Sequence, residues 1–262
     1  MKSISRILLI FSLLTVMIGS LFTSAVPVQA SAGGQRIKIT ACQAVKLVIK
    51  GTAMDGTAVK YTLTKDASDC GTNKITKYYF TDTVKVTAYY YVSSEYPAFK
   101  GQTVSTTISA AEQLSDYALV TVTQPSKRTW MIWRASTWVT DNVAYSSTSR
   151  HDGYRQDCSG FVSFVWQLTK PGTSPSGLTK SAYQIDFSKL KPGDALISSS
   201  HAMIFVQWVD QSAGTFIAYE EEDTGYGTVQ RTLTLNTKTG VIKQSSYYTY
   251  SGTYKAYRLN GL

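Results

Sequence analysis

Apolar and polar residues alternate along much of the first half of the chain. The clearest alternation sets three apolar positions against three that suit a solvent-facing side: Val84, Val86 and Ala88 against Lys85, Thr87 and Tyr89. A period of two places alternate side chains on opposite faces of a strand. The pattern predicts strands over residues 37–40, 45–50, 58–64, 77–80, 84–92, 103–109 and 119–122. We therefore expect an all-β, sandwich-like antiparallel domain over residues 37–123.

The pattern changes after Gln124-Pro125. Ser126 is a suitable cap for a helix over about 127–140, and the tryptophans of that segment are candidate core anchors. A second helix is expected from Cys158 to about Leu168, and strands are expected over 195–198, 202–208, 215–220, 227–234 and 255–259. Helices that precede a mostly antiparallel sheet are typical of the α+β class, which we expect for a second domain over residues 124–262.

The first thirty residues have the features of a secretory signal peptide. Lys2 and Arg6 precede an apolar run over 7–22, and the segment ends in Val28-Gln29-Ala30. We expect cleavage after Ala30, a linker over 31–36, and a protein that is secreted or associated with the cell wall. An uncleaved membrane anchor is the alternative, although the run is short for a span.

The charge of the chain suits anionic surroundings. The formal net charge is +9, and removal of Lys2 and Arg6 with the leader would lower it to +7. Teichoic acids, acidic polysaccharides or anionic lipids would attract such a protein, although solubility alone explains the charge equally well. Basic residues do not cluster with interleaved aromatic residues, so nucleic acid is not an expected partner.

Three cysteines leave one unpaired in an oxidising compartment. Cys42 and Cys70 lie in the same strand-rich region, and we expect them to form a disulfide, with a contribution of about 3 to 4 kcal/mol in the chain-entropy model. Cys158 is then free. A free thiol in an exported protein is either buried or used in chemistry.

Cys158 is placed where a nucleophile would benefit from a helix start. It precedes Phe161, Val162 and Val165 on one apolar helix face, and Asp157 is a suitable N-cap. Unpaired N–H groups at a helix start favour the thiolate form of a cysteine. A cysteine nucleophile also needs a base, and His201, at the start of an apolar strand, is a better candidate than His151 in a polar loop.

These residues resemble the NlpC family of papain-like peptidoglycan endopeptidases. The resemblance rests on Asp157-Cys158-Ser159-Gly160-Phe161-Val162, Leu190-Lys191-Pro192-Gly193-Asp194 and His201, in that order, and covers about residues 127–262. Val143-Ala144-Tyr145 is similar to the family's Pro-Tyr segment. The resemblance implies a papain-like domain and an exported enzyme that hydrolyses an amide bond in the stem peptide of bacterial peptidoglycan, by way of an acyl-enzyme.

The resemblance also implies roles for individual residues. Cys158 would attack and His201 would transfer the proton. Tyr145 would contact the thiolate or the substrate, and Ser159 would either bind the stem peptide or help to cap the helix.

The third catalytic position departs from the family pattern. The family has His, Asn or Gln on the strand after the base, whereas this chain has Ala218-Tyr219-Glu220-Glu221-Glu222. Strand alternation separates Glu220 from Glu221, and we expect Glu220 to orient His201 as the acidic member of a catalytic triad does. The alternative is a solvated acidic strand end, which would leave the third group unassigned.

Other functions remain open on the sequence. A papain-like amidase or acyltransferase would use the same Cys158–His201 pair on another amide or ester, and a catalytically silent wall-binding protein would keep only the fold. We expect no cofactor and no metal, because two isolated histidines and one unpaired cysteine lack ligand spacing. The expected partner is peptidoglycan, with anionic wall polymers as further candidates, and no stable membrane span should remain after signal cleavage.

Overall fold

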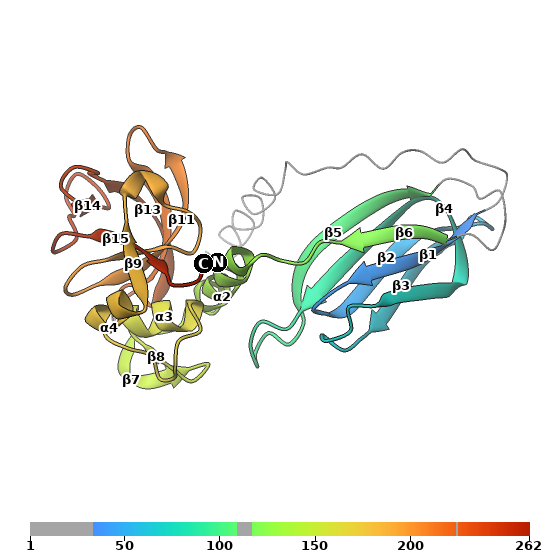
Figure 1. Cartoon of the computed structure of the whole chain (residues 1–262), viewed down its shortest axis with the longest axis horizontal. Coiled ribbons are helices and arrows are strands. Elements are labelled where there is room, and N and C mark those ends of the chain that lie inside the picture. Colours follow the sequence, from blue (N-terminus) through green and yellow to red (C-terminus); the bar gives the residue numbers. More distant parts are fainter. Residues whose placement is uncertain (1–33, 109–116, 224) are drawn as a thin grey trace, which may run out of the picture.

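The computed structural model describes residues 34–108, 117–223 and 225–262. Two sheets form separate lobes, and helix α2 lies between them (Figure 1). The expected signal peptide, residues 1–30, and the first residues of the expected linker lie outside the described residues.

The first lobe is a six-stranded sheet in the order β3-β2-β4-β1-β6, with β5 added to β4. All of its pairs are antiparallel except β1 with β6. Alternate residues of each strand face one core, which includes Ile37, Leu47 and Val86. The strands are β1 (Gln35–Ala41), β2 (Ala44–Ala53), β3 (Ala58–Thr64), β4 (Thr72–Tyr90), β5 (Phe99–Ile108) and β6 (Tyr117–Val122).

Strand β4 connects the two halves of this sheet. Its first part pairs with β1, and its second part pairs with β2 and β5. Asp82 has a positive φ of 61° between these parts. The expected sandwich is therefore one hydrogen-bonded sheet that folds around its core, since β4 is continuous through both halves.

The predicted disulfide is confirmed. Cys42 lies in the turn between β1 and β2, and Cys70 lies in the loop before β4. The bond joins two connections at one end of the first sheet.

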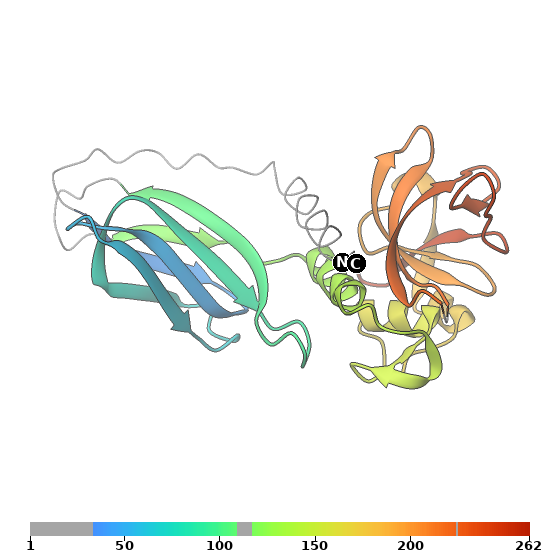
Figure 2. The same cartoon turned by 180° about the vertical axis from the view of Figure 1, so that it is seen from behind.

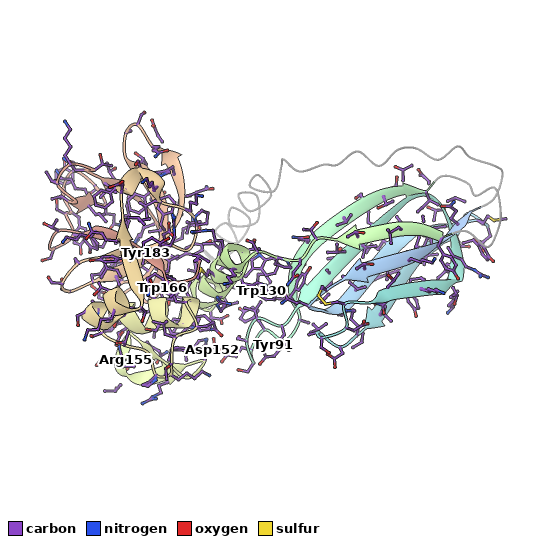
Figure 3. All side chains as sticks on the ribbon, in the orientation of Figure 1. Tyr91, Trp130, Asp152, Arg155, Trp166 and Tyr183 are labelled. Carbon is purple, nitrogen blue, oxygen red and sulfur yellow. A yellow bond between two sulfur atoms is a disulfide. The ribbon has the colours of Figure 1, made fainter. Side chains whose placement is uncertain are left out.

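Helix α2 (Lys127–Asp141) contributes to both lobes. The Ser126 side chain accepts a hydrogen bond from the backbone N–H of Thr129, as the sequence predicts for an N-cap. Trp130 and Trp133 pack on Tyr90 of the first sheet, with ring centroids 5.5 and 5.2 Å apart. Figure 3 shows Trp130 on the side of α2 that faces this sheet.

The second lobe contains a seven-stranded antiparallel sheet in the order β14-β13-β12-β11-β10-β15-β9, seen from behind in Figure 2. Helix α3 packs against β11 and β12 on one face of it. The remaining elements are β7 (Ser146–His151), β8 (Tyr154–Gln156), α3 (Cys158–Val165), α4 (Pro175–Lys180), β9 (Ala182–Ile185), the 3-10 turn η2 (Phe187–Lys189), β10 (Ala195–Ile197), β11 (Ala202–Asp210), β12 (Thr215–Glu221), β13 (Thr228–Leu235), β14 (Ile242–Lys243) and β15 (Lys255–Leu259).

The expected α+β class, with a papain-like domain of helices packed on a sheet, is wrong. The structure is 49% strand and 15% helical, and the described residues contain three α-helices. The cysteine helix ends at Val165, and the expected loop over 145–155 contains the β7–β8 hairpin. No helix in the described part of the chain combines the length and apolar character needed to cross a membrane. Strands β7, β8, β9 and β14 lie in segments where the sequence pattern predicted none, because short, largely polar strands join a hairpin or a sheet without an apolar period.

Candidate active site

The free cysteine, Cys158, is the first residue of α3 and is 8% exposed. The helix begins here because the Asp157 side chain accepts a hydrogen bond of 2.7 Å from the backbone N–H of Gly160. A Cβ at Gly160 would lie 2.1 Å from the backbone oxygen of Arg155, so only glycine fits. The local sequence therefore fixes the position of the thiol at a helix N-terminus.

A network of charged and polar groups holds this helix start. Arg155 donates to Asp157 at 2.6 Å and to the Ser159 hydroxyl at 3.1 Å, and that hydroxyl donates to Asp157 at 2.8 Å. Burial opposes ionisation of Asp157, but the hydrogen bonds from Arg155, Gly160 and Ser159 outweigh it and lower the pKa of Asp157. Ser159 is buried, and its hydroxyl is engaged in the cap rather than directed at a ligand. Figure 3 shows Arg155 in the hairpin region beside α3.

His201 is fixed at the start of β11 by the turn that follows β10. The backbone N–H of Ser198 donates to the His201 oxygen at 2.8 Å, and the backbone N–H of His201 donates to the Ser198 hydroxyl at 3.1 Å. The imidazole stacks on Tyr250 at 5.9 Å and meets Tyr254 edge-on at 6.4 Å. The ring is therefore constrained by its backbone and by two aromatic neighbours.

Glu220 of β12 lies against the imidazole. Its Oε2 is 2.8 Å from Nε2 of His201, and its Oε1 accepts a hydrogen bond of 2.6 Å from the Tyr250 hydroxyl. Glu220 is fully buried, so the sequence alternative of a solvated strand end does not describe it. Because Nε2 faces the carboxylate, the second ring nitrogen, Nδ1, is left for the thiol.

The surroundings of His201 favour its protonated form. Burial alone would lower its pKa, but hydrogen bonds to the side chains of Cys158 and Glu220, together with their negative charges, raise the pKa to about 9. The influence of Cys158 on this pKa places the thiol near the imidazole, in agreement with the packing of α3 against β11. The structure thus brings together Cys158, His201 and Glu220.

Tyr145 lies at the edge of this group. Its pKa is raised by burial first, and then by the negative charges of Cys158, Asp157, Glu221 and Asp223. The side chain is partly exposed, so its phenol is accessible near the thiol. This position is compatible with contact to a substrate.

Glu221 points to the opposite face of β12 and does not take part in the triad. It is fully buried, contacts the Thr228 hydroxyl and leaves Oε1 without a hydrogen-bond partner in the described residues. Burial raises its pKa to about 7, although the hydrogen bond from Thr228 opposes this shift. The alternation of β12 explains why two consecutive glutamates have such different surroundings.

His151 belongs to a different cluster. Its Nε2 is 3.4 Å from Glu95, 3.7 Å from Asp141 and 3.7 Å from Asp152. Glu95, Asp141 and His151 are the described residues whose side-chain atoms are close enough together to share a metal ion. Within the described residues, this cluster forms no hydrogen bond with Cys158, His201 or Glu220. We therefore assign His151 no role in the reaction.

Asp194 holds the second lobe together rather than the site. This fully buried carboxylate bonds Arg128 of α2 at 2.9 Å and Arg258 of β15 at 2.7 Å, and it accepts the backbone N–H of Lys191. The Pro192-Gly193-Asp194 turn therefore connects α2 with the sheet.

An open pocket of 360 Å³ lies beside the turn that carries His201. Ser198 and Ser199 line one side of it, and Pro175 and Ser176 of α4 line the other. Cys158, His201 and Glu220 are not among the residues that line this pocket.

The sequence reasoning missed Tyr250, Tyr254 and Ser198. These residues enclose the imidazole, but the region from Ser245 to Tyr254 has no period of a helix or strand that would indicate it. The one available signal was chemical. A buried carboxylate such as Glu220 needs a second hydrogen-bond donor besides His201, and Tyr250 supplies it.

Comparisons of the chain with protein-family models, with curated proteins and with solved structures found no match.

Proposed function

We propose that this chain is an exported cysteine hydrolase that cleaves an amide bond in the stem peptide of bacterial peptidoglycan. The observation that carries the proposal is the buried group at the start of α3, in which His201 lies near Cys158 and 2.8 Å from Glu220. A nucleophile, a base and a residue that orients the base are the parts that acyl transfer requires.

The chemistry follows from the charges of this group. The imidazolium of His201 and the first N–H groups of α3 both favour a thiolate at Cys158. The thiolate attacks the amide carbon, and the backbone N–H of Cys158 is suited to bind the oxyanion because N–H groups of the first helical turn have no partner within the helix.

Collapse of the tetrahedral intermediate breaks the C–N bond. His201 gives its proton to the leaving amine, and a thioester to Cys158 remains. His201 then takes a proton from water, and the water oxygen attacks the thioester. The C–S bond breaks, the acid product leaves, and the thiolate–imidazolium pair is restored. Glu220 keeps the imidazole oriented through both steps, and Tyr250 keeps Glu220 in place.

Peptidoglycan is the proposed substrate on two grounds. The motifs around Cys158, Asp194 and His201 resemble those of NlpC endopeptidases in residue type and order, and the N-terminal residues resemble an export signal.

The direct test is digestion of purified peptidoglycan with the wild type and with Cys158→Ala, followed by mass analysis of the soluble products. We expect new stem-peptide fragments from the wild type, and a loss of at least about a thousandfold in rate for Cys158→Ala, because the nucleophile is removed. Thr232→Ala, a change at an exposed position of β13 outside the pocket and the Cys158 group, is the matched control for folding.

The masses also separate the competing reactions. Cleavage within the stem peptide supports the proposal, whereas release of whole stem peptides from glycan defines an amidase, and transfer to an added amine defines an acyltransferase. Equal activity of the wild type and Cys158→Ala would contradict the proposed nucleophile.

A further inference from the structure

One outer face of the first sheet carries lysines in register with one another. Lys60 of β3, Lys50 of β2 and Lys85 of β4 are consecutive partners across three adjacent strands. Four residues away from Lys50 along β2, a second row on the same face aligns Lys46 with Tyr89 of β4 and then with Lys100 of β5. We call these five lysines the lysine face: Lys46, Lys50, Lys60, Lys85 and Lys100.

The inward neighbours of these lysines establish that all five point to the same side. Leu47, Ile49, Val59, Val84 and Val86 are buried in the core of this lobe, so the residues that alternate with them face outward. Lys50, Lys60, Lys85 and Lys100 are exposed, and Lys46 lies with its ammonium group 4.1 Å from the Tyr89 ring centroid.

Within the described residues, no carboxylate forms an ion pair with the lysine face. The ion pairs formed by lysines in the described ranges involve Lys65 and Lys189, neither of which belongs to it. The row between the two lysine rows consists of Val48 and three threonines, Thr62, Thr87 and Thr103. The threonines supply hydroxyl groups, and this row contains no carboxylate. Like charges directly opposite each other on neighbouring strands oppose folding, and neighbouring strands are only about 4.8 Å apart.

We propose that the lysine face binds a linear phosphodiester polymer of the bacterial cell wall, which lies across strands β3, β2 and β4. A polymer with repeated negative charges supplies the missing counter-charges and relieves the repulsion within the row. Lysine binds phosphate as a point charge, whereas the planar guanidinium of arginine matches planar carboxylates best. The lysine face contains no arginine, which favours phosphate groups as its ligands. The hydroxyl row provides neutral donors between the charges.

The face is independent of the catalytic group, but the choice of a wall polymer rests on the proposed function. Binding of the polymer would hold the second lobe, with Cys158, close to wall peptidoglycan. It would thus increase the local concentration of substrate without a change in the reaction itself.

The experiment uses the full chain with Cys158→Ala, so that hydrolysis does not affect the measurement, and purified poly(glycerol phosphate) as the probe. Affinity is measured between 50 and 200 mM salt. If five lysines neutralise phosphates, counterion release predicts a loss of about 100-fold in affinity over this range. The triple variant Lys50→Gln, Lys60→Gln and Lys85→Gln should bind more weakly. Its affinity should fall only about sevenfold over the same salt range, because two lysines of the face remain.

The control variant removes the same charge from exposed lysines of the second lobe: Lys180→Gln, Lys238→Gln and Lys243→Gln. It should keep the wild-type salt dependence. Equal weakening by the two triple variants would overturn the proposal, because net charge would then explain binding. Stronger binding to a carboxylate polymer, polygalacturonate, or to anionic phospholipid vesicles would overturn the choice of a phosphodiester polymer.

Thermal unfolding separates loss of binding from loss of fold. The lysine-face variant without polymer should have a Tm equal to or above that of the parent, because charge repulsion has been removed. The polymer should raise the Tm of the parent and not of the variant. Failure of peptidoglycan hydrolysis with intact polymer binding would count against the proposed function alone.

Discussion

At the scale of single residues, consecutive glutamates in β12 show how position decides chemistry. Glu220 accepts hydrogen bonds from His201 and Tyr250, whereas Glu221 is buried with one unpaired oxygen. The first lies beside His201 and raises the pKa of its imidazole. The second is held where ionisation costs free energy.

Glu220→Gln should lower the pKa of His201 from about 9, because a neutral amide no longer stabilises the imidazolium. The alkaline limb of kcat/KM should move to lower pH by roughly one unit or more. NMR titration gives a readout without substrate, and the chain has only two histidines to assign. Tyr250→Phe keeps the carboxylate charge and is the matched control, with a smaller expected shift.

The same change has an effect on stability with a defined sign. The pKa of His201 is higher in the folded than in the unfolded chain, so protonation stabilises the fold. This contribution is complete below pH about 6.5 and is lost as the pH rises through about 9. A wild type and a Glu220→Gln variant with parallel stability curves over this interval would contradict the coupling.

Glu221→Gln should increase stability above pH 7. Burial raises the pKa of Glu221 to about 7, so the protonated carboxyl favours folding and this contribution is lost as the pH rises from about 4.5 through 7. A neutral amide avoids the cost of a buried charge, and we expect a gain of about 1 to 3 kcal/mol at pH 8 and little change at pH 4.5. Urea unfolding at the two pH values measures this gain in stability. A loss of stability of the variant at pH 8 would contradict the prediction.

At the scale of elements, the start of α3 joins a structural cap to the candidate nucleophile. Asp157 caps the helix, pairs with Arg155 and accepts the Ser159 hydroxyl, while the next residue is Cys158. Helix geometry and thiol position therefore depend on the same carboxylate.

Asp157→Ala should destabilise the protein by about 1 to 2 kcal/mol and lower activity, because the cap and the orientation of the first turn are lost. Asp157→Asn keeps a side-chain acceptor for the cap and should lose less stability. The pKa of Asp157 is lowered in the folded protein, since hydrogen bonds outweigh burial, so its ionic contribution is present at neutral pH and is lost on acidification. Urea unfolding at pH 7 and pH 3 should show the difference between wild type and Asp157→Asn only at pH 7.

Sequence patterns were informative about elements where the residues follow a regular period. Alternation around Val86 predicted a strand, and Ser126 and Asp157 predicted helix starts. The pattern failed at 145–155, because Ser146–His151 forms a strand of polar residues whose partner is three residues away in the chain. Such a hairpin depends on local pairing rather than on a buried face, and therefore has no hydrophobic signature.

At the scale of the whole molecule, α2 links the two cores. Trp130 and Trp133 pack against Tyr90 of the first lobe, whereas Trp138 stacks on Phe164 at 5.1 Å in the second. Arg128 of the same helix forms an ion pair with Asp194, which directly precedes β10 of the sheet that carries His201. The helix thus supports the lobe that contains Cys158 on one side and the lysine-bearing sheet on the other.

The sequence by itself determined the features that depend on neighbouring residues: the cap at Asp157, the alternation of β4 and β12, and the choice of Cys158 as the unpaired cysteine. Only the tertiary structure decided which distant groups meet. It placed Tyr250 on Glu220, aligned Lys60, Lys50 and Lys85 across three strands, and divided the tryptophans of α2 between two cores. Periodicity fixes the side of an element on which a residue lies, but the register between elements depends on how the whole chain buries its apolar surface.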